Sequence, residues 1–136
     1  MKAILQGCAL AAWLCAGPAF AQTAPGSADG KTLFARNCAA CHQADGRGIP
    51  GAFPALAGSV LALGAPAEAA EVLLKGRGGM PDFSGSLDDA DIAAVLSYVR
   101  ASWGNRAAPV AHAEVGALRS ALQLPPANRN RFGNKH

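Results

Sequence analysis

A pair of cysteines three positions apart, with a histidine directly after the second, restricts the fold of this chain more than any other feature. These residues are Cys38, Cys41 and His42. Two thiols at this spacing can bond to the two vinyl groups on one edge of a porphyrin, and the adjacent imidazole then lies beneath the iron. The pattern therefore predicts covalent attachment of one haem c through the two cysteines, with His42 as an axial ligand of the iron.

The two cysteines also have other interpretations. In an exported protein a pair of cysteines ordinarily forms a disulfide, and Cys-x-x-Cys can be a thioredoxin-like redox centre or half of a zinc site. A redox centre is expected in a βαβ context, and no segment shows the alternating pattern of a strand. A zinc site needs more ligands at close spacing, whereas His112 and His136 lie far along the chain. The sequence therefore favours haem attachment.

Residues 1–21 have the pattern of a secretory signal peptide. Lys2 gives a positive start, a long apolar run follows, and Ala19-x-Ala21 is a small-residue cleavage pattern. We expect cleavage after Ala21 and export to the periplasm by a Sec-type route, because no Arg-Arg pair is present. The alternative is a retained membrane anchor, but the run is shorter than the roughly 20 apolar residues that a span requires.

Met80 is the only methionine of the chain apart from Met1. It lies within residues 75–83, where glycines and a proline indicate a surface loop. A lone methionine usually fills a core, but a surface loop offers it no core unless the loop packs on another group. A haem face would provide that contact, and Met with His is a standard axial pair that raises the reduction potential. We therefore predict Met80 as the sixth ligand.

Two further motifs stand in a familiar order with the cysteines. Residues 54–58 read Pro-Ala-Leu-Ala-Gly, and residues 79–81 read Gly-Met-Pro. The first is similar to the Pro-x-Leu-x-Gly loop, and the second to the Met-ligand loop, of class I cytochromes c. Over about residues 28–104 the chain resembles the small monohaem members of that family from the bacterial periplasm.

The resemblance carries expectations for individual residues. It implies that the carbonyl of Pro54 accepts the ring N–H of His42 and that Leu56 packs on the haem. It also implies that an N-terminal helix with Gly30 and Phe34 is crossed closely by a C-terminal helix, which contains Val95, Tyr98, Val99 and Trp103. The stretches Gly-Arg-Gly-Gly-Met-Pro and Ser-Tyr-Val-Arg-Ala-Ser-Trp-Gly-Asn most resemble cytochromes that serve periplasmic dehydrogenases or form subunits of them.

Local signals predict the first two of three main helices. The first covers residues 29–37, with Ser27 or Ala28 at its start, and serine is the better cap. The second covers residues 66–74 and starts at a proline, a residue suited to the first turn of a helix. Gly76 is expected to end it, because glycine is the commonest residue just beyond a helix.

The third predicted helix starts after Asp88, which can cap it, and ends at Gly104. One face is apolar at helical spacing and comprises Ile92, Val95, Leu96, Val99 and Trp103. Aromatic residues make up only 6% of the chain, so the side chains alone give a thin core and the haem would fill it. We expect an all-α class I cytochrome c fold, with three main helices and long loops around one haem, plus a C-terminal extension.

The charge of the chain changes after residue 104. Residues 28–104 carry six basic and eight acidic residues, whereas residues 105–136 carry five basic residues and one acidic residue. We expect a lead over 22–27, a cytochrome domain over 28–104, an extension with a short helix over 105–124, and a disordered basic tail over 125–136. The extension either packs back on the domain or docks on a partner through its apolar stripe or its charge.

Several side chains near the predicted site have two interpretations. Arg77 either pairs with a haem propionate, since guanidinium groups suit carboxylates, or is a solvated loop charge. Phe53 and Phe83 either shield the haem edge or fill loop cores. Tyr98 and Trp103 either donate hydrogen bonds or pack on a helix face with their polar tips at the rim.

We therefore expect a periplasmic one-electron carrier with a His/Met-ligated haem. Its expected partners are redox proteins, with a periplasmic dehydrogenase as donor and a terminal oxidase or another cytochrome of the respiratory chain as acceptor. We expect no nucleic-acid partner, and membrane contact only through these proteins. The alternatives are an obligate cytochrome subunit of a dehydrogenase complex and, with an open sixth position, a haem enzyme or gas sensor, although no distal catalytic histidine or acid is evident.

Overall fold

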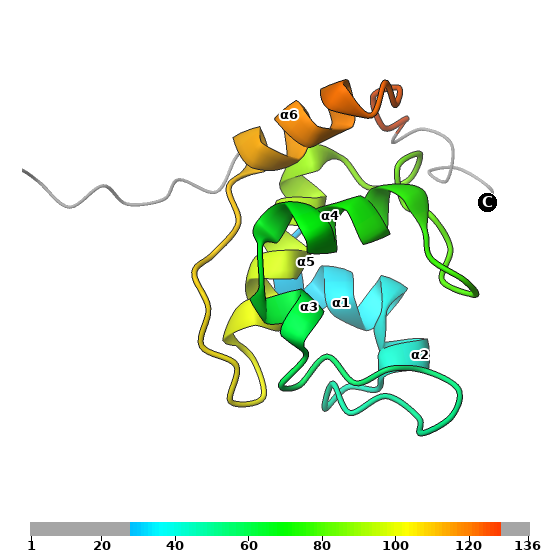
Figure 1. Ribbon diagram of the computed structural model, residues 1–136, viewed down its shortest axis with the longest axis vertical. Helices are drawn as coiled ribbons and strands as arrows, with labels where there is room; N and C mark the ends of the chain where they lie inside the picture. Colours follow the sequence, from blue (N-terminus) through cyan, green and yellow to red (C-terminus); the bar gives the residue numbers. More distant parts are fainter. Residues whose placement is uncertain (1–27, 129–136) are drawn as a thin grey trace, which may run out of the picture.

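Six helices form the secondary structure of residues 28–128, the part of the chain that this computed structural model describes (Figure 1). In chain order they are α1 (Gly30–Asn37), α2 (Ala39–His42), α3 (Val60–Leu63), α4 (Pro66–Lys75), α5 (Asp89–Ala101) and α6 (His112–Ala121). Within these residues there is no sheet, so the expectation of an all-α fold is confirmed. The predicted signal peptide (1–21), the lead (22–27) and residues 129–136 of the predicted tail lie outside the described residues.

The three main predicted helices correspond to α1, α4 and α5, but the start of α1 differs from the prediction. Asp29 caps this helix, in place of Ser27 or Ala28, and its Oδ1 accepts the backbone N–H of Thr32 at 3.0 Å. The second carboxylate oxygen accepts the hydroxyl of the same threonine at 2.6 Å. A carboxylate satisfies a free N–H at a helix start as well as a serine hydroxyl does, so the cap lies nearer to the helix than expected.

The signals for α4 and for the start of α5 are confirmed. Pro66 occupies the first turn of α4, and Gly76 ends it with φ 72° and ψ 170°, a conformation that is essentially restricted to glycine. Asp88 caps α5 by accepting the N–H of Asp91 at 2.8 Å. These ends depend on residues next to one another in sequence, which is why sequence patterns predict them.

The end of α5 differs from the prediction. The helix stops at Ala101 rather than Gly104, and Trp103 lies in the following turn with a φ of +54°. Its indole N–H donates to the carbonyl of Ala44 at 3.0 Å, and its ring packs on Phe34 with the centroids 5.1 Å apart. Trp103 therefore joins the core from a turn, and tertiary contacts rather than helical periodicity determine its position.

The crossing of α1 and α5 is close because Gly30 has no side chain. A Cβ at this position would lie 2.8 Å from Cβ of Tyr98 and would also clash with the backbone carbonyl oxygen of Ala94. The packing expected for Gly30 is confirmed. The two helices bring together the central apolar side chains of the core, which include Leu33, Phe34, Ile92, Val95, Leu96 and Val99.

The C-terminal extension packs on the domain. Figure 1 shows α6 lying across α4 and α5, at the end of the molecule opposite α2 and the long loop that follows it. Val115 of α6 is fully buried, and Val110 just before the helix is nearly so. No helix within residues 28–128 is both long and apolar enough to cross a membrane.

The chain beyond α6 also contacts the domain before it leaves the described residues. The carbonyl of Pro125 accepts a bond from Arg119 at 3.1 Å, and the N–H of Asn128 donates to the carbonyl of Gly85 at 3.3 Å. Residues 125–128, the first part of the predicted disordered tail, thus contact both α6 and the loop that precedes α5.

A second arginine, Arg100 near the end of α5, binds both the extension and α3. Its side chain is 4% exposed. The guanidinium donates to the carbonyls of Ala62 at 2.8 Å and Gly64 at 2.9 Å, at the end of α3, and to that of Ala108 at 2.6 Å in the extension. Arg100 and Arg119 therefore fix the extension at two places along its length.

Candidate haem-binding site

A cavity of about 380 Å³ lies between α3, α4, α5 and the loops on either side of them. A neighbouring cavity of about 290 Å³ shares part of its wall. The residues that line both are Cys38, His42, Pro54, Arg77 and Met80. Most of the remaining wall of the larger cavity is apolar and includes Leu56, Leu61, Ala69, Val72, Leu73, Val95, Leu96 and Val99. The structure thus brings all the predicted site residues to one place, with Cys41 on the wall of the smaller cavity.

His42 is held in one orientation by the loop that follows it. The ring is 7% exposed, and its Nδ1 lies 2.9 Å from the carbonyl oxygen of Pro54. A carbonyl oxygen can only accept, so Nδ1 carries the proton and Nε2 keeps its lone pair. The predicted bond between His42 and Pro54 is therefore present, and it leaves one ring nitrogen available to a metal.

The loop that carries Pro54 is itself well anchored. We call residues 42–58 the His42 segment. Its turns are closed by bonds from Gly48 N–H to the His42 carbonyl at 2.9 Å and from Leu56 N–H to the Gly46 carbonyl at 2.7 Å. Such short-range backbone bonds fix the carbonyl of Pro54 beneath the imidazole.

Asn105 joins the His42 segment to the end of α5. It is 5% exposed. Its amide N–H₂ donates to the carbonyls of Leu56 at 3.1 Å and Val99 at 2.8 Å, and its oxygen accepts the N–H of Gly58 at 2.8 Å. A buried amide with three partners positions the backbone of this segment against the helix.

Cys38 caps the short helix α2 and Cys41 lies within it, and the two cysteines form no disulfide. Burial raises the pKa of the Cys38 thiol to about 11, and the neighbouring Cys41 adds to this in the same direction. A redox-active Cys-x-x-Cys needs a thiol with a lowered pKa. The environment of Cys38 is the opposite, which argues against the thioredoxin-like interpretation. Among residues 28–128 no three His, Cys, Asp or Glu side chains gather at a possible metal site.

Met80 lies on the second loop that faces the cavity. We call residues 76–88 the Met80 segment. Met80 and Arg77 exchange two backbone hydrogen bonds of 3.0 and 3.1 Å, and the N–H of Phe83 donates to the carbonyl of Leu73 on α4 at 2.8 Å. Gly76 is also needed here, because a Cβ there would lie 2.7 Å from the Met80 carbonyl oxygen. Met80 thus lies on a narrow turn that is hydrogen-bonded to the end of α4.

The residues with two interpretations are placed as follows. Arg77 is exposed but lines both cavities, and its pairing with a propionate stays a prediction. Phe53 and Phe83 both line the smaller cavity, and Phe53 is 39% exposed. Trp103 donates to a loop carbonyl rather than into the cavity, and Tyr98 packs against it with the ring centroids 5.7 Å apart.

The cavity fits a haem. Its wall is apolar, two thiols stand at haem-attachment spacing beside it, and it receives an imidazole with a free Nε2 and a thioether sulfur. Imidazole and thioether are ligands suited to haem iron. Because the donors and the apolar wall meet in one place, the residues present fit the group that the sequence predicts.

Three polar residues that support the site were missed by the sequence analysis. They are Asn105, Arg100 and Arg119, all at most 5% exposed and all bonded mainly to backbone carbonyls. Asn105 had been placed at the start of the extension rather than in the domain. A polar residue that binds carbonyls distant in sequence produces no periodic pattern in the sequence. The one available signal for the burial of such a residue was its position beside an apolar helix face.

Comparison with known proteins gives a consistent result. Residues 26–99 match the family described as cytochrome c oxidase, cbb3-type, subunit III. Cytochrome c-552 of Thermus thermophilus is 37% identical over 131 residues, which cover 79% of this chain and 99% of that protein. The cytochrome c subunit of the quinone-type alcohol dehydrogenase of Gluconacetobacter polyoxogenes is 35% identical over 68% of this chain, but only 23% of that subunit is covered.

A third relative is the cbb3-type oxidase subunit of Azospirillum brasilense, 37% identical over 57% of this chain and 28% of that subunit. The relatives thus include a small cytochrome matched along almost its whole length, and redox subunits matched over one part. The motif, the cavity and these relatives agree. The chain belongs to the class I cytochrome c family, and it is an electron-transfer protein with one covalently bound haem c.

Proposed function

We propose that this cytochrome is a periplasmic one-electron carrier whose iron is ligated by His42 and Met80. The observation that carries the proposal is that both side chains line the same apolar cavity beside Cys38. When bound, haem c supplies an iron that alternates between two oxidation states. The residues of this chain hold, orient and shield it.

His42 contributes through its orientation. The bond from Nδ1 to the Pro54 carbonyl fixes both the tautomer and the ring plane, and it makes Nε2 a better electron donor. Because the His42 segment is closed by backbone bonds, the ring need not move when the charge of the iron changes. Little rearrangement is a requirement for fast electron transfer between proteins.

Met80 contributes a soft ligand and excludes water. A thioether favours the reduced iron relative to a second nitrogen ligand and so raises the potential. Phe53, Pro81 and Phe83 line the smaller cavity beside Met80 and would cover part of a bound haem. Replacement of Met80 by Ala should abolish the sulfur–iron charge-transfer band of the oxidised protein and lower its potential.

The matched control for this experiment is His112→Ala. His112 is exposed on α6 and lines neither cavity, so its removal should leave the band and the potential unchanged. A band that persists in the Met80 variant, with an unchanged potential, would mean that Met80 is not the ligand. Fast stoichiometric binding of carbon monoxide to the reduced native protein would instead favour an open sixth position.

The proposed donor is a periplasmic dehydrogenase, and the proposed acceptor is a terminal oxidase or another cytochrome. The support comes from relatives named as a cytochrome c subunit of an alcohol dehydrogenase and as an oxidase subunit. A free carrier is favoured over a permanent subunit, because 99% of a small cytochrome is matched but only 23% of the dehydrogenase subunit. Copurification of the untagged protein with a larger dehydrogenase would support the subunit alternative.

The periplasmic location is supported by the signal-peptide pattern of residues 1–21. The mature protein should begin at Gln22. Mass spectrometry of the purified cytochrome tests this directly, since removal of the signal and addition of one haem both change the mass by fixed amounts. A protein that retains residues 1–21 and sediments with membranes would contradict it.

A further inference from the structure

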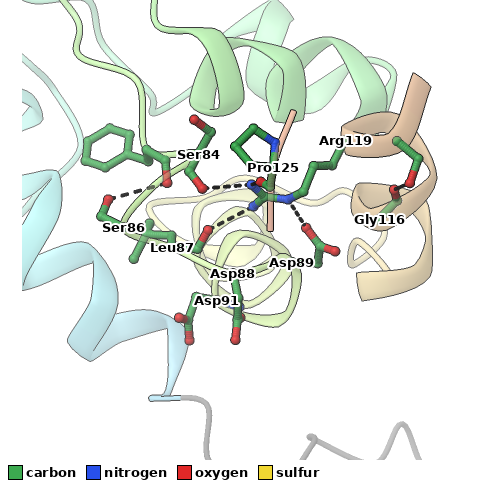
Figure 2. Close-up of polar contacts among 11 residues, drawn as sticks. Ser84, Ser86, Leu87, Asp88, Asp89, Asp91, Gly116, Arg119 and Pro125 are labelled. Atoms are coloured by element: carbon green, nitrogen blue, oxygen red, sulfur yellow. Dashed lines mark hydrogen bonds and ion pairs between the residues drawn. The ribbon is translucent and has the colours of Figure 1, made fainter. Parts of the chain in front are cut away.

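Arg119 on α6 makes the most extensive polar contact of the extension. The side chain is 6% exposed. Its Nε donates to Asp89 Oδ1 at 2.6 Å, one terminal nitrogen to the carbonyls of Ser84 at 2.7 Å and Pro125 at 3.1 Å, and the other to that of Leu87 at 2.9 Å. Figure 2 shows the guanidinium surrounded by these oxygens, between α6 and the chain that leads into α5.

Two of these partners lie on the Met80 segment. Ser84 is four residues after Met80, and Leu87 directly precedes the cap of α5. The segment is bound to α4 at its start, where the N–H of Gly76 donates to the carbonyl of Val72 at 2.9 Å. It is bound to α4 again between Met80 and Ser84, where the N–H of Phe83 donates to the carbonyl of Leu73 at 2.8 Å. The chain around Met80 is therefore held at both ends, and Arg119 provides the side-chain bonds at the second end.

These bonds are of a kind that resists local opening. Charged donors bind carbonyls more strongly than neutral donors do, and the carbonyls would lose this buried partner if the segment moved away. Loops open locally with a probability set by such contacts. A ligand from solution can replace a loop ligand only in the open state, so its apparent affinity is proportional to the open fraction.

We propose that Arg119 is a positioning residue that keeps Met80 on the iron by holding residues 84–89 closed. The extension thereby controls how readily an external ligand displaces the thioether. The inference rests on the proposed ligation by Met80. It assigns to α6 a role at the haem that none of its side chains could perform by contact, since no α6 residue lines either cavity.

The test measures imidazole binding to the oxidised, haem-loaded full-length protein, together with global unfolding. Arg119→Ala should bind imidazole more tightly, by about tenfold, because the open fraction rises. Arg119→Lys, which keeps the charge but offers fewer directed donors, should give an intermediate affinity. If the alanine variant yields no haem protein, the imidazole affinity of Arg119→Lys alone tests the proposal. Asp89→Asn should change the affinity least, because the three carbonyl bonds remain.

Arg100→Ala is the matched control. Arg100 is equally buried and also binds three carbonyls, including one in the extension, but it does not touch the Met80 segment. It should lower global stability without the same gain in imidazole affinity. The inference would be overturned if Arg119→Ala and Arg100→Ala gained imidazole affinity equally, or if neither Arg119→Ala nor Arg119→Lys changed it. Either result would leave the proposed ligation by Met80 standing. A wild-type protein without the sulfur–iron band would overturn the proposed ligation and the inference with it.

Discussion

The two loops that face the haem cavity are anchored in different ways. The His42 segment is closed by its own backbone bonds and by Asn105, which lies just beyond α5. The Met80 segment is a narrow turn bound to α4 at one end and to Arg119 of the distant α6 at the other. The loop of His42 is thus held by its own bonds and by Asn105, whereas the loop of Met80 depends also on a helix that follows Met80 by more than thirty residues.

The difference indicates a division of roles. His42 directly follows Cys41 and lies four residues after Cys38, so the imidazole and the two haem-attachment thiols are positioned together. The thioether must be brought from elsewhere and held by tertiary contacts. We therefore expect perturbations of the His42 segment to act on the whole fold, and perturbations of the Met80 segment to act locally.

The largest effect is expected where both loops lose their common support. Gly30→Ala places a Cβ against Tyr98 and the backbone of Ala94, so α1 and α5 must move apart. We expect the free energy of unfolding to fall by about 3 kcal/mol. In denaturant titrations of the haem-loaded protein, the Soret signal and the sulfur–iron band should disappear together.

Gly85→Ala is the control, because a Cβ there meets nothing within 4 Å. It should change the free energy of unfolding by less than about 0.5 kcal/mol. A mild effect of Gly30→Ala would mean that the two helices tolerate separation and that the crossing does not support both loops.

The next effect concerns the His42 segment. Asn105→Ala removes three buried hydrogen bonds, to Leu56, Gly58 and Val99. We expect a loss of about 2–3 kcal/mol of unfolding free energy, with no selective gain in imidazole affinity. Asn37→Ala removes one bond of an exposed side chain and should cost far less. Tighter imidazole binding in the Asn105 variant would show that this segment also gates the iron.

A smaller and more local effect is expected at the Met80 segment. Gly76 and Gly78 both have positive φ, but only at Gly76 would a Cβ approach the Met80 carbonyl. Gly76→Ala should cost about 2 kcal/mol and Gly78→Ala about 1 kcal/mol, the latter from backbone strain alone. On heating, the charge-transfer band of the Gly76 variant should vanish well before global unfolding. Equal behaviour of the two variants would show that the contact with Met80 is unimportant.

The smallest effect is a pH dependence at the start of α5, beside the Met80 segment. Burial raises the pKa of the Asp91 carboxyl above its ordinary value of 3.8. The folded state keeps this proton to higher pH than the unfolded state does, so the stability that protonation supplies is lost as pH rises through the raised pKa. Asp91→Asn should lack this component. Unfolding free energies from pH 3 upward, taken as wild type minus variant, should fall over this window, and a flat difference would contradict the prediction.

The sequence predicted best what neighbouring residues determine. Pro66, Gly76 and Asp88 mark helix ends through backbone groups within a few positions, and the structure confirms them. The bond between His42 and Pro54 was predicted through a resemblance over a short motif and is also present. Ligation by His42 and Met80 stays a prediction, supported by a shared cavity.

What the sequence did not predict depends on distant partners. Arg119 was one basic residue of the extension, and nothing in its neighbours indicated the carbonyls of Ser84 and Leu87. Trp103 fitted the helical period, yet its bond to Ala44 places it in a turn. The choice between an extension that packs back and one that docks elsewhere required knowledge of which buried donors and acceptors of the domain need a partner.

The position of Cys38 and Cys41 beside His42 has a consequence for the kinetics of refolding. A cofactor held only by ligands leaves when the chain unfolds, and its recapture depends on concentration. A haem bonded to two thiols next to its own ligand stays within reach of the imidazole in the unfolded chain. Refolding of this cytochrome should therefore be first order, with a rate that is independent of protein concentration and of added haem.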